Sequence, residues 1–452
     1  MPDHGCPVGG LRDSRRPSLI LCDIISIKNK MIFTMKKLKF PEGFLWGAST
    51  SAHQVEGGTD NNWSEWEKKN AERLAREAHS KWDPGQREKF PEMLKAENYI
   101  SGKACDHYNL YEKDFEIAKE LGHNAHRFSV EWSRIEPEQG TFDEEQIEHY
   151  RKVIRSLREK GIEPFVCLWH WTNPVWLEKE GGIASELFVP YFSRYVDKVS
   201  QALGNEARFW VTLNEPTSML AAGYVKGSWP PQKRNPFAAL SIYKILSDAH
   251  KEAYGILHKN CENIKVGFAD MLWYLEPANK NSILDKLVVK IADYFTNGKF
   301  LKMTEGFNDF LTAQYYFYRK FSFPGIAKNS FEDITDMGWD IHAEGIYHII
   351  THLKKYNLPI YVTENGLADS EDKKRTKFIK DHLFCIHKAI SEGADVRGYF
   401  YWSLLDNFEW DKGFWPRFGL VEVDFETQER RIRPSALEYK KTCESNELEI
   451  EE

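Results

Sequence analysis

The sequence lacks the cysteine patterns that staple small domains or hold metal ions. It has seven cysteines in 452 residues, and none forms a Cys-x-x-Cys or Cys-x-x-His spacing. A scattered, odd set argues against a disulfide framework and a zinc site, and favours a reducing compartment. The cysteines therefore predict a cytoplasmic protein. His53 and His170 have no neighbouring ligand residues in sequence, so we expect no metal and no cofactor. The cysteines are Cys6, Cys22, Cys105, Cys167, Cys261, Cys385 and Cys443.

Long basic runs and long apolar runs are also missing. The net charge is −7, which argues against nucleic acid and anionic membranes as partners. No stretch reaches the roughly 18 apolar residues of a membrane span. Residues 18–27 imitate a signal peptide, but Asp23 interrupts the apolar run and no small-residue cleavage site follows. We interpret residues 1–34 as an extension outside the folded domain, with Met35 as a candidate natural start.

Aromatic residues, by contrast, are abundant: they make up 14% of the chain and include 15 tryptophans. A tryptophan offers a flat apolar face and one N–H donor, which suits the C–H face and the hydroxyls of a sugar ring. A large aromatic core would use the same residues, and composition alone favours that explanation. The function therefore has to be inferred from local motifs.

Short apolar runs alternate with helical patterns from Phe40 onward. Each run is continuously apolar, as expected for a parallel sheet covered on both faces. Eight such strands separated by helices favour an α/β fold of one (β/α)8 barrel over an open doubly wound sheet. We expect one domain over residues 35–445, followed by an acidic tail at 446–452. The predicted strands are residues 44–48, 125–129, 164–168, 209–213, 265–268, 309–314, 360–363 and 396–402.

Helix signals and long excursions lie between these strands. Residues 143–160 begin at Asp143, a good N-cap residue, and end before Gly161, which suits a left-handed C′ position. The excursions at residues 57–104 and 225–240 are expected to form walls of the barrel mouth, where barrel enzymes carry their active sites. The apolar face predicted for the helix is Ile147, Tyr150, Ile154 and Leu157.

Two glutamates stand at the ends of apolar strands, each beside an asparagine. Residues 210–216 read WVTLNEP and residues 361–366 read YVTENG, which places Glu215 on the fourth strand and Glu364 on the seventh. Carboxylates at the C-terminal ends of barrel strands point into the mouth. Either glutamate alone is equally well explained as a strand-end cap, so the matched pair carries the functional hypothesis.

Two facing carboxylates suit the cleavage of a glycosidic bond. One carboxyl protonates the leaving oxygen, and the other attacks the anomeric carbon or activates water. A separation of about 5–5.5 Å would indicate retention of configuration, and about 6.5–9.5 Å inversion. The spacing in sequence does not decide between these two outcomes.

These motifs resemble those of the family-1 glycoside hydrolases, the β-glucosidase and β-galactosidase family. WVTLNEP is similar to the acid/base signature of the family, and YVTENG to its nucleophile signature. The resemblance spans about residues 38–440 and implies a retaining mechanism on a (β/α)8 barrel. Further matching runs, in family order, are residues 44–57 (FLWGASTSAHQVEG), 127–137 (RFSVEWSRIEP), 168–176 (LWHWTNPVW), 401–413 (YWSLLDNFEWDKG) and 417–420 (RFGL).

The resemblance implies catalytic roles for five residues. Glu215 would be the general acid/base and Glu364 the nucleophile. Arg127 would lie beside Glu364 and keep it ionised by opposite charge, and Tyr316 would donate a hydrogen bond to it. Asn214 would bond the 2-hydroxyl of the sugar, a contact that strengthens in the transition state.

It also implies a sugar-binding set and one unusual peptide bond. Polar side chains would bond the sugar hydroxyls, two tryptophans would form the platform under the ring and close its side, and a third would stack on the leaving group. The Trp402–Ser403 peptide is expected to be cis. The set is Gln54, His170, Asn214 and Glu409 for the hydroxyls, Trp402 and Trp410 for the ring, and Trp339 for the leaving group.

Three positions bear on the subfamily. The family usually has an asparagine where this chain has Gln314, so we leave Gln314 out of the site. Enzymes for 6-phosphorylated sugars replace the acidic residue at 409, and Glu409 would repel a phosphate. Thioglucosidases replace the acid/base with glutamine, and Glu215 is present, so O-glycosides are the expected substrates.

We therefore expect a β-glucosidase with secondary β-galactosidase and β-fucosidase activity, acting on small β-glycosides or oligosaccharides. The sequence leaves open the preferred sugar, the balance between hydrolysis and transglycosylation, and whether the chain forms a homo-oligomer. A silent sugar-binding barrel is the alternative from another class, and it would normally lack one of the two glutamates. Both are present here.

Overall fold

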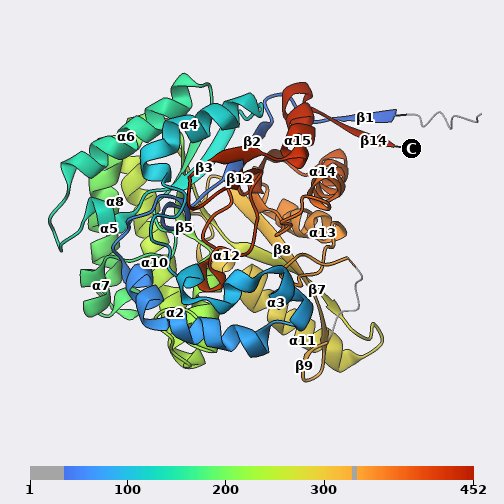
Figure 1. The fold of residues 1–452 in the computed structure, drawn as a ribbon, viewed down its shortest axis with the longest axis horizontal. Helices are drawn as coiled ribbons and strands as arrows, with labels where there is room; N and C mark the ends of the chain where they lie inside the picture. The colour runs from blue at the N-terminus through green and yellow to red at the C-terminus, as the bar shows by residue number, and fades with distance from the viewer. Residues whose placement is uncertain (1–34, 328–332, 452) are drawn as a thin grey trace, which may run out of the picture.

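The computed structural model describes residues 35–327 and 333–451, so the expected extension at 1–34 lies outside the described residues. A curled, largely parallel sheet lies at the centre and helices surround it (Figure 1). Across the sheet the strands are β6 (Lys265–Ala269), β5 (Phe209–Asn214), β4 (Glu163–Cys167), β3 (Ala125–Ser129), β2 (Leu45–Ser49), β11 (Val396–Trp402), β10 (Ile360–Asn365), β8 (Leu311–Ser322) and β7 (Met271–Pro277), with β9 (Gly325–Ile326) antiparallel to β8.

All eight predicted strands are confirmed, two of them with unchanged bounds. β3 and β5 are buried along their whole length, which explains why they show no polar alternation. The main difference is at β8, which extends to Ser322 because its second half pairs with β7. β7 follows β6 after one residue, Asp270, and the sequence pattern did not separate it from its neighbours.

Hydrogen bonds also join β6, at one end of the sheet order, to the segment of β8 near the other end. Asp309 N–H donates to the Val266 carbonyl at 2.8 Å, and the Thr312 hydroxyl donates to the Phe268 carbonyl at 3.1 Å. The curled sheet thus encloses a set of side chains. Phe165 and Phe209 stack inside it at 4.1 Å between ring centroids, together with rings from β10 and β11.

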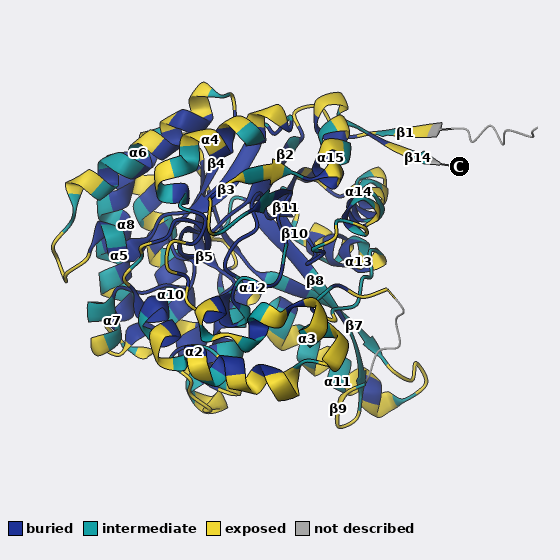
Figure 2. Cartoon of the chain, viewed as in Figure 1, coloured by how far each residue is buried: buried dark blue, intermediate teal, exposed yellow. Residues whose placement is uncertain are grey.

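Helices cover the outside of the sheet, with their exposed sides outward (Figure 2). α6 (Glu144–Glu159) behaves as predicted: Asp143 accepts from the backbone N–H groups of Glu145 and Gln146, Gly161 has φ +74°, and the predicted apolar face is buried. The other long helices between strands are α4 (His107–Glu120), α8 (Phe188–Leu203), α10 (Pro236–Asn260), α11 (Ile283–Asp293), α13 (Glu344–Leu353) and α14 (Arg375–Ser391).

The excursion after β2 forms α2 (Asn62–Lys81) and α3 (Pro84–Lys89), which lie toward the viewer in Figure 1. Asn61 caps α2 in a capping box with Ser64. Shorter or terminal elements are α1 (Ala52–Val55), α5 (Trp132–Ile135), α7 (Val175–Lys179), α9 (Pro216–Leu220), α12 (Lys299–Met303), α15 (Pro434–Ser445), β12 (Val421–Val423) and β13 (Arg430–Ile432).

The two ends of the described chain lie side by side. The acidic residues 447–451, expected as a tail, form strand β14 (Glu447–Glu451), which pairs antiparallel with β1 (Met35–Lys39). Lys37 bridges Glu447 and Glu449 across the pair, which gives the acidic segment a basic partner. Figure 1 shows this ribbon projecting from the body of the molecule.

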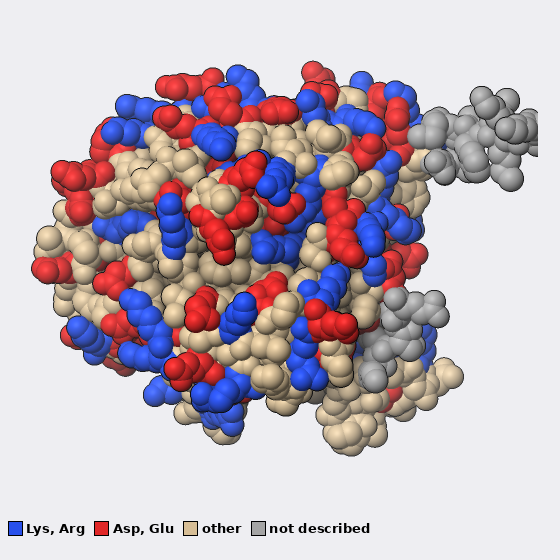
Figure 3. Space-filling model, viewed as in Figure 1, with Lys and Arg blue, Asp and Glu red and all other residues tan. Residues whose placement is uncertain are grey.

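Three further observations concern the described residues as a whole. Their five cysteines are buried free thiols. None of their helices combines the length and apolarity that a membrane crossing requires. Acidic and basic side chains are intermixed over the face in Figure 3, which is hollowed near its middle.

Candidate active site

The two glutamates lie at C-terminal ends of strands, and local backbone geometry places each. Glu215 directly follows β5 and takes a left-handed φ of +42°, where the chain turns from strand into α9. Its N–H donates to the Ala269 carbonyl at 2.7 Å, so the turn is held to the end of β6. Pro216 begins α9, a position at which its missing N–H costs no helix hydrogen bond. Both glutamates are only 4% exposed.

Glu364, near the end of β10, is bonded to a buried arginine and a tyrosine. Arg127 on β3 is fully buried and donates from Nη1 to Glu364 Oε1. Tyr316 on β8 donates its hydroxyl to Oε2 at 3.0 Å. Tyr316 and Glu364 come from the adjacent strands β8 and β10, whereas β3 is separated from β10 by β2 and β11 in the sheet order. The predicted Arg127–Glu364–Tyr316 grouping is present.

The surroundings of the two carboxyls differ in electrostatic effect. Burial raises the pKa of Glu364 above its ordinary value, but the charge of Arg127 and the hydrogen bond from Tyr316 oppose that rise. Burial and the negative charge of Glu364 together raise the pKa of Glu215 well above its ordinary value. The surroundings of the pair thus favour ionisation of Glu364 over ionisation of Glu215.

Asn214 directly precedes Glu215 and is bonded to Arg127, the arginine that contacts Glu364. Its Oδ1 accepts from Arg127 Nη2 at 2.5 Å and from Gln314 Nε2 at 3.0 Å. Its Nδ2 lies 2.9 Å from Nε2 of His170. Since the amide oxygen is engaged by two donors, the orientation of the amide group is determined.

His170 is buried and held neutral. Burial, followed by the charge of Arg127, lowers the pKa of its ring well below the ordinary value. Within the described part of the chain, its Nδ1 is buried and has no hydrogen-bond partner. A buried polar atom usually finds a partner, so this nitrogen is suited to bonding a hydroxyl of a ligand.

Aromatic rings surround this polar group. The His170 ring stacks near Trp402, at 6.3 Å and 26° between rings, and near Trp410, at 5.9 Å and 18°. Trp410 also stacks on His53 at 5.5 Å and packs on Trp171 at 4.7 Å. The Trp402–Ser403 peptide is cis, which confirms the prediction.

Gln54 and Glu409 form a second polar group beside Trp410. Gln54 Nε2 donates to the Phe408 carbonyl at 2.8 Å and reaches Glu409 Oε2 at 3.4 Å. Burial raises the pKa of Glu409 to about 8, and Lys412 opposes this shift. The raised pKa favours the protonated Glu409 carboxyl, which can both donate and accept hydrogen bonds, so the repulsion of a phosphate expected from a charged Glu409 is weakened.

Trp339 lies beside Tyr316, the tyrosine that bonds Glu364. Its ring packs on Phe317 at 4.6 Å and meets the Tyr316 ring edge-on at 6.1 Å. The structure thus brings all eleven predicted site residues into one connected group, while their roles remain predictions.

Sequence reasoning missed three neighbours of the site. Gln314 was left out, yet it bonds Asn214 and favours the ionised form of Glu364. Trp171 has no predicted role, and its Nε1 donates to the Asn214 carbonyl at 2.8 Å. Asp270, between β6 and β7, was not singled out. Its position after an apolar strand, like that of Glu215, was the available signal.

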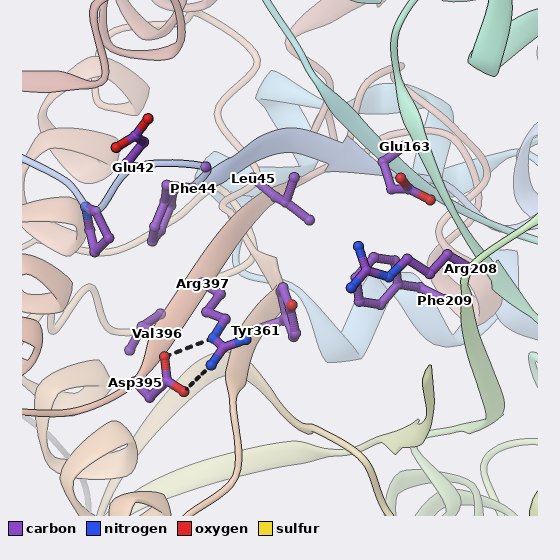
Figure 4. A pocket seen from close by; sticks show the side chains of 12 residues that line it. Glu42, Phe44, Leu45, Glu163, Arg208, Phe209, Tyr361, Asp395, Val396 and Arg397 are labelled. Carbon is purple, nitrogen blue, oxygen red and sulfur yellow. Dashed lines mark hydrogen bonds and ion pairs between the residues drawn. The ribbon is translucent and has the colours of Figure 1, made fainter. Parts of the chain in front are cut away.

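A pocket of about 350 Å³ lies at the opposite ends of the strands (Figure 4). Four residues that line the pocket are each the first residue of a strand: Leu45, Glu163, Phe209 and Val396. Residues at this end of a barrel usually serve stability. Among the described residues, no group of three or more His, Cys, Asp or Glu side chains is arranged to hold a metal ion.

Comparisons with known proteins find relatives along most of the chain. The family model described as Glycosyl hydrolase family 1 matches residues 36–322 and 324–448. Beta-glucosidase A of Thermotoga maritima is 34% identical over 92% of this chain and the whole of that protein. The beta-glycosidase from Pyrococcus horikoshii superposes with a TM-score of 0.81 at 36% identity, covering 91% of this chain and 96% of that one. The Thermotoga maritima beta-glucosidase in complex with glucoimidazole gives 0.78 at 31% identity, over 90% and 99%.

Proposed function

The chain belongs to glycosyl hydrolase family 1, and we propose that it is a retaining β-glycosidase with Glu364 as nucleophile and Glu215 as general acid/base. The contrast between the two buried carboxyls carries this proposal. Glu364 bonds a guanidinium and a hydroxyl, whereas Glu215 lies in the field of Glu364. Surroundings that separate the pKa values of two carboxyls suit an acid and a nucleophile.

The reaction then runs as a double displacement. An oxygen of Glu364 bonds the anomeric carbon while the glycosidic bond breaks, and the departing oxygen takes the proton of Glu215. The ester has no charge on Glu364, so the pKa of Glu215 falls and the ionised Glu215 can accept a proton from water. That water attacks the anomeric carbon and Glu364 leaves, so two inversions restore the β configuration.

The remaining side chains are assigned to binding. Four polar side chains bond the hydroxyls of the terminal non-reducing sugar, and two tryptophans contact its ring. The polar residues are Gln54, His170, Asn214 and Glu409, and the tryptophans are Trp402 and Trp410. The free Nδ1 of His170 and the raised pKa of the Glu409 carboxyl support this assignment. The substrates are small β-D-glucosides or oligosaccharides, with β-galactosides and β-fucosides as secondary substrates. Trp339 stacks on the leaving group.

A closed (β/α)8 barrel is the second part of the proposal. Its strands are β2, β3, β4, β5, β6, β8, β10 and β11, and residues 35–445 form one catalytic domain. The hydrogen bonds between β6 and β8 support closure. A closed ring also explains how strand ends from opposite parts of the sheet order contribute to one site.

The test of the function is the configuration of the first product. p-Nitrophenyl β-D-glucoside is hydrolysed in an NMR tube, and the anomeric proton of the released glucose is followed before mutarotation. β-Glucose appearing first supports the proposal. α-Glucose first would mean inversion, and an enzyme inert on gluco, galacto, fuco and manno β-aryl glycosides would contradict the whole assignment.

Tyr316→Phe is expected to move the acidic limb of the kcat/KM profile to higher pH, by up to about one unit. The hydroxyl bonds the ionised form of Glu364, so its loss raises the pKa of Glu364 and delays ionisation as pH rises. Tyr315→Phe is the matched control, because the Tyr315 hydroxyl donates instead to the His342 carbonyl. If the acidic limbs of wild type and Tyr316→Phe coincided, the Tyr316 hydroxyl would not favour the ionised form of Glu364.

A further inference from the structure

Asp270 is a second buried carboxyl beside the expected acid/base, and the mechanism above does not use it. It lies between β6 and β7, with 4% of its surface exposed. The residue before it, Ala269, accepts the backbone hydrogen bond of Glu215 at 2.7 Å. The two acidic residues are therefore carried by backbone segments that are bonded to each other.

The Asp270 side chain holds the segment that follows Glu215. The Thr217 hydroxyl donates to Asp270 Oδ2 at 2.7 Å, and the Met271 N–H donates to Oδ1 at 3.1 Å. Thr217 is the second residue of α9 and lies two positions beyond Glu215. The hydrogen bond thus ties the end of β6 to the turn that carries the acid/base.

The charge of Asp270 is not balanced locally. Among the described residues no Lys, Arg or His makes an ion pair with it, and burial raises its pKa to about 7 despite the bonds from Thr217 and Met271. Its charge is among the causes that raise the pKa of Glu215, after burial and the charge of Glu364. Like charges close together disfavour a second ionisation.

We propose that Asp270 is a positioning residue for Glu215: it holds the turn that carries Glu215 through Thr217, and it places a second carboxyl beside that turn. The inference rests on the proposed role of Glu215 as general acid/base. As pH rises through neutrality, Asp270 becomes charged and delays the loss of the Glu215 proton. The alkaline limb of activity is thereby extended.

The other groups that face this pair do not produce the effect. Arg127 on β3 opposes the rise in the pKa of Glu215, and the charge of Glu364 on β10 adds to that rise in wild type and in an Asp270 variant alike. Burial raises the pKa of Tyr316 on β8 and of Tyr243 on α10, so both remain neutral. Burial raises the pKa of Glu409 to about 8, and the charge of Glu409 acts on Tyr316.

Asp270→Asn is the discriminating variant, because asparagine keeps the shape and removes the charge. Its Oδ1 can accept from Met271, and its Nδ2 can donate to a rotated Thr217 hydroxyl. We expect the alkaline limb of kcat/KM for p-nitrophenyl β-D-glucoside to move about half to one pH unit lower, while the rate on the plateau stays within about threefold. Thr217→Ser, which keeps the donor, should retain the wild-type profile.

Two outcomes would overturn the inference. One is an Asp270→Asn limb that coincides with that of wild type. The other, measured on unaltered enzyme and so independent of how the variant folds, is a ¹³C NMR titration of labelled aspartates in which no carboxyl titrates between pH 6 and 8. A wild type that hydrolyses no β-aryl glycoside would instead contradict the proposed function itself.

Discussion

Glu364→Gly is expected to lower kcat for p-nitrophenyl β-D-glucoside on the order of 10⁴-fold or more, because no other group can form the covalent intermediate. Glycine also leaves space beside Arg127. Added azide should enter that space and attack the anomeric carbon from the face that Glu364 used, so that p-nitrophenolate leaves. The product should be α-glucosyl azide, formed by one inversion, and the rate should rise with azide concentration.

The chain offers a matched control for this substitution. Glu163 is also a strand glutamate, but it is the first residue of β4 and lines the pocket at the opposite end of the strands (Figure 4). Glu163→Gln should keep wild-type kcat and show no response to azide. A Glu364→Gly enzyme within tenfold of wild type, or one that produced β-glucosyl azide, would remove Glu364 from the role of nucleophile.

Glu215→Ala is expected to have the second largest effect, and the size of that effect should depend on the leaving group. General acid catalysis contributes about 10²–10⁴-fold. For cellobiose, whose leaving group is a sugar hydroxyl, we expect a loss of roughly 10³-fold in kcat/KM. For 2,4-dinitrophenyl β-D-glucoside, whose phenolate departs without a proton, kcat/KM should stay within about tenfold of wild type.

The second half-reaction gives an independent check on the same variant. Without Glu215 as base, water attacks the ester slowly, so the glycosyl-enzyme should accumulate and show a burst of dinitrophenolate. Azide needs no base, so it should accelerate turnover and give β-glucosyl azide, the opposite anomer to that expected from Glu364→Gly. Equal losses of kcat/KM with both leaving groups would contradict the acid/base assignment. So would a Glu215→Ala enzyme whose kcat/KM still falls at alkaline pH as in wild type.

Much of the fold could be predicted because the signals are local. An apolar run buried on both faces identified each of the eight strands, and Asp143 and Gly161 marked both ends of α6. β7 was missed because its aromatic run continues from β6 after a single residue, and only pairing with the second half of β8 defines it. Pairing is a property of two segments, and neither segment specifies it alone.

The site residues also fall into two classes: those that a local motif identifies and those that only the fold brings to the site. Glu215, Glu364 and their companions were found because motifs at strand ends are contiguous in sequence. Gln314 was left out because the family usually has an asparagine there. It belongs to the site because β8 lies next to β10 and the Gln314 side chain reaches Asn214. Asp270 belongs to no motif, and its importance appears only with its burial and its bond to Thr217.

By itself, the sequence determined where the eight strands lie and which two glutamates stand near strand ends, because a short run of residues carries that information, whereas the far end of β8 depends on its pairing with β7. Only the tertiary structure supplies the surroundings that favour the proton on Glu215 over Glu364. Arg127 lies 237 residues from Glu364 in the chain, and the pKa of each carboxyl depends on burial by many segments and on charges brought close by the sheet. Solvation and electrostatic fields depend on distance in space, and distance in space is set only once the strands have assembled.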